Sequence, residues 1–193
     1  MKRAVILGGT FDPPHNGHLR ILHAAQCAVN AQKAFIIPTC TPPHKSNDGV
    51  TSAKDRLEMC HLAAENIGAD VLDIEMKRGG KSYTVDTLCE LAKLYPDYEL
   101  YLVMGSDMLS TLQSWVRYEE IIKRAKIIAF AREGISFDEL KSFAKRAEND
   151  GASVTLLDIL PDGISSTSIR QHIKEGLSVN DMVPENVLKY LGG

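Results

Sequence analysis

Short apolar runs alternate with amphipathic stretches along the whole chain. Residues 100–103 (Leu-Tyr-Leu-Val) and 127–130 (Ile-Ile-Ala-Phe) are continuously apolar. Runs of this kind are typical of strands that are buried on both faces of a parallel sheet. The pattern predicts strands over 3–7, 34–38, 71–75, 99–104, 127–131 and 154–158.

Between these runs, apolar residues recur at helical spacing. They predict helices over 17–30, 52–66, 84–94, 106–123 (with a possible break), 136–148, 167–175 and 184–191. Ser52, Thr84 and Ser136 fit N-cap positions, and Glu139 completes a capping box with Ser136. Pro96 is a stop signal after the third helix.

The alternation predicts an α/β fold, a doubly wound (Rossmann-like) parallel sheet flanked by helices. In such a sheet, ligands bind at the carboxyl ends of the strands. We expect a single domain over 1–193, with a C-terminal helical segment from about 165. The polar stretch 39–51, rich in proline and glycine, is typical of a binding loop.

Composition narrows the class of protein. A net charge of −3 over 193 residues argues against a nucleic-acid partner. The four cysteines have irregular spacing and include no C-x-x-C, so we expect free thiols in a reducing compartment. No signal peptide or membrane-spanning run is evident, which predicts a cytoplasmic protein without a membrane partner. The sequence leaves open whether the chain is a homo-oligomer.

The segment from Gly8 to Leu19 follows the first predicted strand and opens a helix. A glycine-rich turn allows backbone N–H groups to approach an anion, and the helix dipole favours negative charge at the same place. His15 and His18 lie on one side of the helix entrance. The segment is neither a G-x-G-x-x-G fingerprint nor a Walker A loop. Metal binding by the two histidines is disfavoured, since only Asp12 is a nearby acidic residue, and we predict no metal held by the protein.

Two signatures carry a family resemblance. Residues 9–18 (Gly-Thr-Phe-Asp-Pro-Pro-His-Asn-Gly-His) resemble the H-x-G-H signature of the nucleotidyltransferase superfamily, and residues 164–170 (Ile-Ser-Ser-Thr-Ser-Ile-Arg) resemble its second signature. Residues 42–45, 81–88 and 105–107, with Trp115 downstream, resemble bacterial nicotinate mononucleotide adenylyltransferases, so that the likeness runs from residue 3 to about 190. Val116 departs from the family pattern, where a second aromatic residue is common; Tyr118 is a candidate to replace it.

The resemblance implies transfer of the AMP part of ATP to nicotinate mononucleotide, with release of pyrophosphate. The expected catalytic residues are His15, His18, Lys45 and Arg170. The expected ATP contacts are Gly8, Gly9, Thr10, Phe11, His15, His18, Gly105, Asp107, Ser165, Ser166, Thr167 and Arg170. The expected contacts of nicotinate mononucleotide are His44, Lys45, Ser82, Tyr83, Thr84 and Trp115.

These residue types suit the reaction. A phosphate monoester is mostly ionised at neutral pH, so the nucleophile needs no general base, and the protein must supply positioning and charge stabilisation. Mg²⁺ would be carried mainly by the ATP phosphates. Trp115 either stacks on the pyridine ring or only packs; Thr84 either binds the nicotinate carboxylate or only caps a helix; Asp107 either accepts from a ribose hydroxyl or caps a helix. Phosphopantetheine as acceptor, or a non-catalytic ATP or NAD sensor, are the alternative functions.

Overall fold

The centre of the molecule is a parallel sheet. The computed structural model describes residues 1–41, 50–65, 67–159 and 163–192, and within them the strand order is β3-β2-β1-β4-β5-β6. The strands are β1 (Lys2–Gly9), β2 (Lys33–Pro38), β3 (Asp70–Val71), β4 (Tyr98–Gly105), β5 (Ala125–Phe130) and β6 (Val154–Leu157). Every pairing between them is parallel, which confirms the predicted doubly wound α/β fold.

The strand order reverses between β1 and β4. From β1 the chain first builds outward to β2 and β3, then returns to β4 on the other side of β1 and continues to β5 and β6. In an open α/β sheet, the crevice at such a reversal is the usual ligand site. Gly8 and Gly9 end β1, and Gly105 ends β4, so the glycines singled out in the sequence lie at this reversal.

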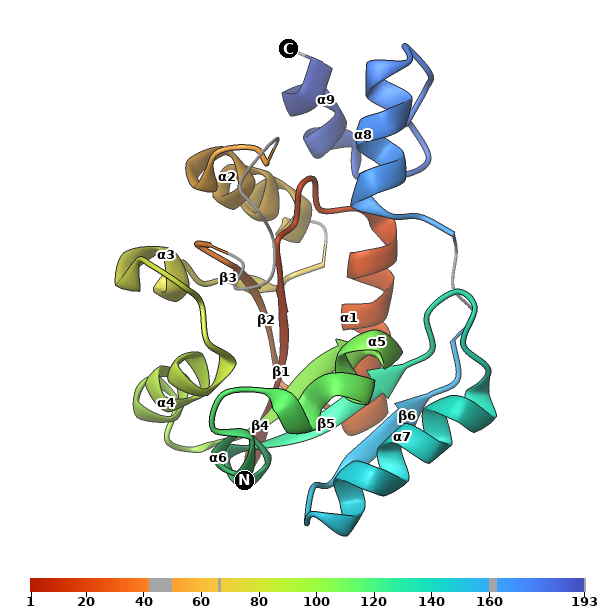
Figure 1. The fold of residues 1–193 in the computed structure, drawn as a ribbon. Helices are drawn as coiled ribbons and strands as arrows, with labels where there is room; N and C mark the ends of the chain where they lie inside the picture. The colour runs from red at the N-terminus through yellow and green to blue at the C-terminus, as the bar shows by residue number, and fades with distance from the viewer. Residues whose placement is uncertain (42–49, 66, 160–162, 193) are drawn as a thin grey trace.

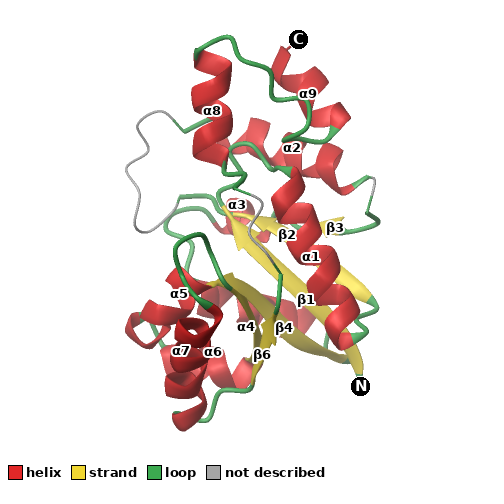
Figure 2. Ribbon diagram, turned by 90° about the vertical axis from the view of Figure 1, so that its right-hand side faces the viewer, coloured by secondary structure: helices red, strands yellow, loops and turns green. Residues whose placement is uncertain are grey.

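Helices cover both faces of the sheet (Figures 1 and 2). The elements α1 (Asn16–Val29), α2 (Ala53–Ala64), α8 (Ser166–Lys174) and α9 (Glu185–Gly192) pack on one face. The other face carries α4 (Thr84–Leu94), α5 (Ser106–Thr111), a 3-10 turn (Leu112–Ser114), α6 (Tyr118–Arg124) and α7 (Phe137–Asn149). A short helix, α3 (Ile74–Arg78), precedes α4.

An apolar core lies on each face of the sheet, and successive residues of a strand point into opposite cores, because side chains alternate along a strand. In β1, Val5 and Leu7 pack with α1 and α2, whereas Ala4 and Ile6 pack with α4. Residues that are buried on both faces explain why the apolar runs of the sequence are continuous rather than alternating.

One predicted strand is wrong in all but its first residue. We expected a strand over 71–75, but β3 ends at Val71 and α3 begins at Ile74. The Glu75 side chain is buried and accepts a hydrogen bond from the Thr87 hydroxyl at 2.6 Å. This tertiary contact with α4 holds the segment as a helical turn, and its local apolar pattern gives no sign of it.

Two of the three predicted N-caps are confirmed, and one is wrong. Ser52 and Ser136 cap α2 and α7, and Glu139 completes the capping box. Thr84 is not an N-cap: Tyr83 takes that position, and Thr84 is the first residue of α4. The expected break within 106–123 lies at Trp115 to Arg117, where Arg117 adopts a left-handed φ of 56°.

The C-terminal helices are tied to the start of the chain. The Asn16 N–H donates to the Met182 carbonyl at 2.9 Å, and the Asn16 side chain donates to the Asp181 carbonyl at 3.0 Å. The Tyr190 hydroxyl of α9 donates to Asp55 of α2 at 2.8 Å. Figure 1 shows α8 and α9 beside α2, where β1 ends and α1 begins. Within the described residues, no helix is long and apolar enough to cross a membrane.

Candidate active site

The loop from β1 to α1 is shaped by one aromatic side chain. Phe11 is only 2% exposed, and its ring covers Gly9 so closely that a Cβ on Gly9 would lie 3.1 Å from the ring. Phe11 itself has a left-handed φ of 50°, an uncommon conformation for a bulky residue. Gly9 is therefore needed for packing in the loop. The expected approach of its backbone to a phosphate stays a prediction.

His15 and His18 form a stacked pair at the start of α1. Their ring centroids lie 3.6 Å apart with an angle of 24° between the planes, and the edge of Phe11 contacts His18 at a centroid distance of 4.9 Å. The His15 N–H donates to His18 Nδ1 at 3.3 Å. The neutral His18 ring therefore carries its proton on Nε2, where it can donate to a ligand.

His18 is kept uncharged. Burial lowers the pKa of His18 well below its usual value, and the neighbouring His15 and Arg132 lower this pKa further. At neutral pH the ring is thus a neutral hydrogen-bond donor. A neutral donor suits the stabilisation of charge that develops on a phosphoryl oxygen, because it needs no change of protonation during the reaction.

The second signature lies directly against this loop. The Ser166 hydroxyl donates to the Pro13 carbonyl at 2.9 Å, and Arg170 Nη1 donates to the Asp12 carbonyl at 2.6 Å. Arg170 Nη1 is also 3.8 Å from the Asp12 carboxylate. Ser165 caps α8 by accepting from the Ser168 N–H at 3.0 Å. Segments more than 150 residues apart in sequence are therefore joined in one place, as the two signatures predicted.

Thr167 also belongs to this cluster. Its hydroxyl accepts a hydrogen bond from Arg170 Nη2 at 3.4 Å. Arg170 is thus held by two contacts at once: a local one to Thr167 of the same helix and a long-range one to the Asp12 carbonyl. A helix start with an arginine fork suits phosphate oxygens.

At the end of β4, Asp107 pairs with Arg132 at 3.1 Å. A Cβ on Gly105 would lie 2.5 Å from the Asp107 carboxylate and 2.6 Å from Arg132 Nε, so only glycine leaves room for this pair. The Arg132 N–H donates to the buried Ser106 hydroxyl at 3.0 Å. The cap interpretation of Asp107 is wrong, because α5 starts at Ser106 with Gly105 as its N-cap. A ribose contact of Asp107 stays a prediction.

Arg132 was not predicted from the sequence. It follows β5 at the carboxyl edge of the sheet, next to Gly105 at the end of β4, and its charge acts on His18. Its position just after a buried strand is the signal that could have identified it.

The residues expected to contact the pyridine lie around α4 and the turn before α6. Tyr83 and Thr84 begin α4 and are partly exposed. Trp115 is half-buried against the core and lines an open cleft of about 880 Å³ with Tyr118, Arg117 and Lys123 among others. Their contact with a pyridine ring stays a prediction.

Ser82 has a different environment. It is 8% exposed, and its hydroxyl accepts from the Cys40 N–H at 3.1 Å. The Ser82 N–H in turn donates to the Thr41 carbonyl at 3.2 Å. Ser82 therefore joins the end of the β2 segment to the start of α4, and a direct contact with nicotinate mononucleotide stays a prediction.

Comparison with known proteins identifies the family. The cytidylyltransferase-like family model matches residues 6–172, a span that contains both signatures. The chain belongs to the cytidylyltransferase-like family.

Relatives of this family resemble the chain over its full length. It is 36% identical to a protein of Clostridium tetani over 100% of this chain and 98% of the relative, and 40% identical to a protein of Desulfitobacterium hafniense over 98% and 93%. Both relatives are named "Probable nicotinate-nucleotide adenylyltransferase". The nicotinic acid mononucleotide adenylyltransferase of Plasmodium falciparum complexed with NaAD has the same fold, with a TM-score of 0.78 at 21% identity over 99% of this chain and 95% of that one.

Two predicted site residues, His44 and Lys45, lie outside the described part of this cytidylyltransferase-like chain. Within the described part, no group of three or more histidine, cysteine or acidic side chains is placed to hold a metal ion. The Asp12 carboxylate accepts from the Thr51 N–H at 3.3 Å and faces Arg170, while Asp107 faces Arg132. The acidic side chains at the site are thus already paired.

Proposed function

We propose that the chain joins the AMP part of ATP to nicotinate mononucleotide, giving deamido-NAD and pyrophosphate as a step of NAD biosynthesis. The junction of the two signatures carries this proposal: the Ser166 hydroxyl donates to the Pro13 carbonyl and Arg170 to the Asp12 carbonyl, so the start of α8 lies against the loop that follows β1. The names of full-length relatives with 36% and 40% identity support the same reaction.

In this reaction a phosphate oxygen of the mononucleotide attacks the α-phosphorus of ATP. The new P–O bond forms as the bond to the β-phosphate breaks, and pyrophosphate leaves. Because the attacking phosphate is already ionised at neutral pH, the protein needs no general base. It must align the two phosphates and stabilise the charge on the reacting phosphoryl group and on the leaving group.

The described residues supply these functions as follows. His18 donates from Nε2 to a phosphoryl oxygen, and His15 holds His18 in place through stacking and a backbone hydrogen bond. Backbone N–H groups of Gly9 to Phe11 bind phosphate oxygens. Arg170, held at the start of α8, turns its guanidinium to the β- and γ-phosphates. Lys45, which lies outside the described residues, is proposed as a further cation.

The paired acidic groups of the site fit a cation that arrives with its nucleotide. We propose that Mg²⁺ is coordinated mainly by triphosphate oxygens and water, as this hard cation prefers. When bound, Mg²⁺ neutralises part of the phosphate charge. The cytoplasmic location stays a prediction, and the oligomeric state stays open.

An acceptor panel tests the proposal. Pyrophosphate release from ATP is measured with nicotinate mononucleotide, nicotinamide mononucleotide and phosphopantetheine in parallel. We expect turnover with nicotinate mononucleotide to exceed turnover with the other acceptors. Selective turnover of phosphopantetheine would overturn the assigned acceptor. Binding of ATP with no pyrophosphate released by any acceptor would favour a sensor.

A further inference from the structure

Among the residues that the structure describes, Arg56 is the most deeply buried charged side chain that the reaction above does not use. It lies in the first half of α2, and its side chain is 2% exposed. Burying a charge is costly unless its hydrogen bonds are satisfied, so a buried arginine calls for a specific reason. Burial lowers the pKa of the Arg56 guanidinium, and the nearby Asp12 opposes this effect.

The guanidinium holds three separate segments by their backbone carbonyls. Nη1 donates to Thr10 at 2.7 Å, Nη2 to Cys40 at 3.1 Å and Nε to Thr51 at 3.2 Å. Thr10 lies in the loop from β1 to α1. Cys40 lies just after β2, and Thr51 lies just before α2. The planar fork of arginine spreads its donors over Nε, Nη1 and Nη2 in fixed directions, whereas a lysine ammonium presents all its donors from one nitrogen atom.

The bond to Thr10 bears directly on the reaction. The Thr10 carbonyl and the Phe11 N–H belong to one rigid, planar peptide unit and point in opposite directions. Fixing the carbonyl toward Arg56 therefore fixes the direction of the Phe11 N–H. Within the described residues, this N–H has no hydrogen-bond acceptor, so it is available to a phosphate oxygen. The strained φ of 50° at Phe11 makes an external hold on this peptide necessary.

We propose that Arg56 is a positioning residue for adenylyl transfer, which keeps the Thr10–Phe11 peptide turned so that its N–H faces the phosphates of ATP. The inference rests on the proposed function. Hydrogen bonding of the carbonyl to a cation also polarises the peptide and strengthens its N–H as a donor.

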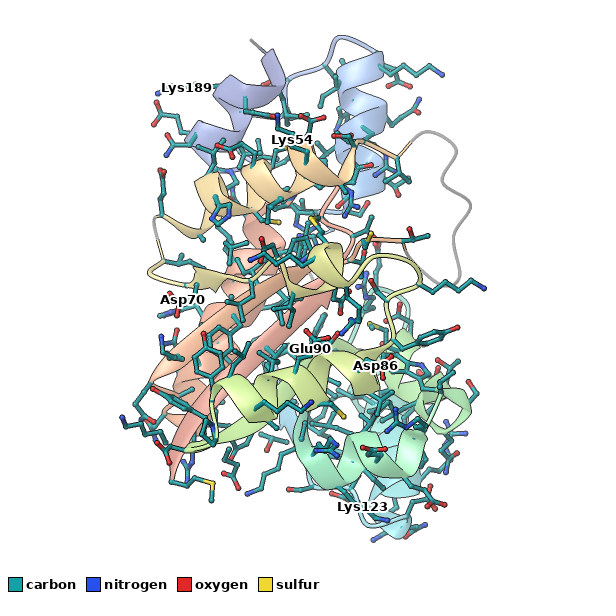
Figure 3. All side chains as sticks on the ribbon, turned by 90° about the vertical axis from the view of Figure 1, so that its left-hand side faces the viewer. Lys54, Asp70, Asp86, Glu90, Lys123 and Lys189 are labelled. Atoms are coloured by element: carbon teal, nitrogen blue, oxygen red, sulfur yellow. The ribbon has the colours of Figure 1, made fainter. Side chains whose placement is uncertain are left out.

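Two variants test this role. Arg56→Lys keeps the charge but cannot reach three carbonyls, and Arg56→Met fills the space without a buried charge. Lys54→Met is the matched control, since Lys54 is exposed on the same helix and is labelled in Figure 3. Circular dichroism and thermal melting first establish the folded fraction of each protein.

Two measurements then separate positioning from stability. In kinetics per folded enzyme, we expect Arg56→Lys and Arg56→Met to lower kcat about 10- to 100-fold, with little change in the KM of nicotinate mononucleotide, and Lys54→Met to match the unmodified enzyme. In ¹H–¹⁵N spectra, ATP is expected to shift the Phe11 amide of the unmodified protein, and this shift is expected to be strongly reduced in both Arg56 variants.

The outcomes are distinguishable. Folded Arg56 variants with normal kcat and a normal ATP-induced shift at Phe11 would overturn the role of Arg56 and leave the proposed function intact. If neither variant folds, ATP titration of the unmodified protein still decides, because an unmoved Phe11 amide on binding of ATP would overturn the inference. An unmodified protein that binds ATP at Phe11 but turns over no acceptor would contradict the proposed function alone.

Discussion

The part of the site where we expect phosphates to bind (the phosphate side) and the part where we expect the pyridine ring to bind (the pyridine side) are built in opposite ways. On the phosphate side, Asp12 and His15 are buried, and hydrogen bonds connect residues 153 to 165 positions apart. On the pyridine side, Trp115 is half-buried in an open cleft, and the neighbouring Val116 is 51% exposed. In Figure 3, Asp86 on α4 and Lys123 on α6 lie at this outer side of the molecule.

This difference in construction suggests that residues on the phosphate side control the rate of the reaction step, whereas residues on the pyridine side control affinity for one substrate. On the phosphate side, the position of every group depends on several distant segments, so a change there should disturb the reaction step. On the pyridine side, a single local stretch presents side chains to an open cleft, so a change there should alter affinity for one substrate and leave the reaction step intact.

The largest effect is expected at His18. We expect His18→Ala to lower kcat on the order of 10²–10³-fold with the fold intact, because it removes one charge-stabilising donor. Steady-state kinetics on protein of verified fold measures this loss. His23→Ala is the matched control, since His23 is an exposed histidine on the same helix. A His18→Ala enzyme as fast as the control would show that His18 takes no part in the reaction.

A methyl group on Gly105 should give the next largest effect. The added Cβ would meet both partners of the Asp107–Arg132 pair at under 3 Å and push them from the edge of the site. Because these side chains are half exposed and can move, we expect a small loss of stability but a fall in kcat/KM of roughly 10- to 100-fold for Gly105→Ala. Gly192→Ala, where nothing lies near the added atom, is the control. If kcat/KM is unchanged in Gly105→Ala, the Asp107–Arg132 pair takes no part in substrate binding or the reaction.

Trp115 tests the pyridine side. Loss of an indole face from a cationic ring costs about 0.5–2 kcal/mol, so we expect Trp115→Ala to raise the KM of nicotinate mononucleotide roughly 2- to 30-fold with little change in kcat. Trp115→Phe should recover part of the loss, and Val116→Ala serves as a neighbouring control. If Trp115→Ala lowers kcat as His18→Ala does, the contrast between the two sides is wrong.

The smallest effect concerns pH. Because the pKa of His18 is lowered on folding, the unfolded chain binds this proton more tightly, and the contribution of His18 to stability is complete above about pH 6.5 and is lost as the pH falls. One such group changes the free energy of unfolding by at most about 1.4 kcal/mol per pH unit, or about 3–6 °C in Tm. Melting curves between pH 7.5 and 5.5 should therefore fall less steeply for His18→Gln than for the unmodified protein. Equal slopes would contradict the lowered pKa.

Much of the fold follows from the sequence, because its strongest signal is burial on both faces of a strand. The runs at 99–104 and 127–131 lie within a few residues of β4 and β5. The two signatures were likewise recognisable, because residues 9–18 and 164–170 resemble known family signatures and the local chemistry of the first also indicates phosphate binding. The segment 71–75 was misassigned because its helical turn depends on Glu75 reaching Thr87 of another helix.

The contacts of two arginines could not be predicted, for a different reason. Arg132 stands among polar residues typical of a surface loop, and its partner Asp107 lies on another segment. Arg56 follows Lys54 and Asp55 in what looks like the solvated start of a helix. In both cases the sequence shows the arginine, but it does not show which distant carboxylate or backbone carbonyl the arginine contacts in the fold.

The bonds from Asn16 to Asp181 and Met182 have a consequence for synthesis of the chain. Domains generally begin to fold from the N-terminus while the ribosome is still adding residues. The sheet can form once β6 has emerged, yet the entrance of α1, with its two imidazoles, obtains its anchors only after the later segment with Asp181 and Met182 has emerged as well. The nascent protein can therefore assemble its scaffold before the contacts that complete the geometry of its site.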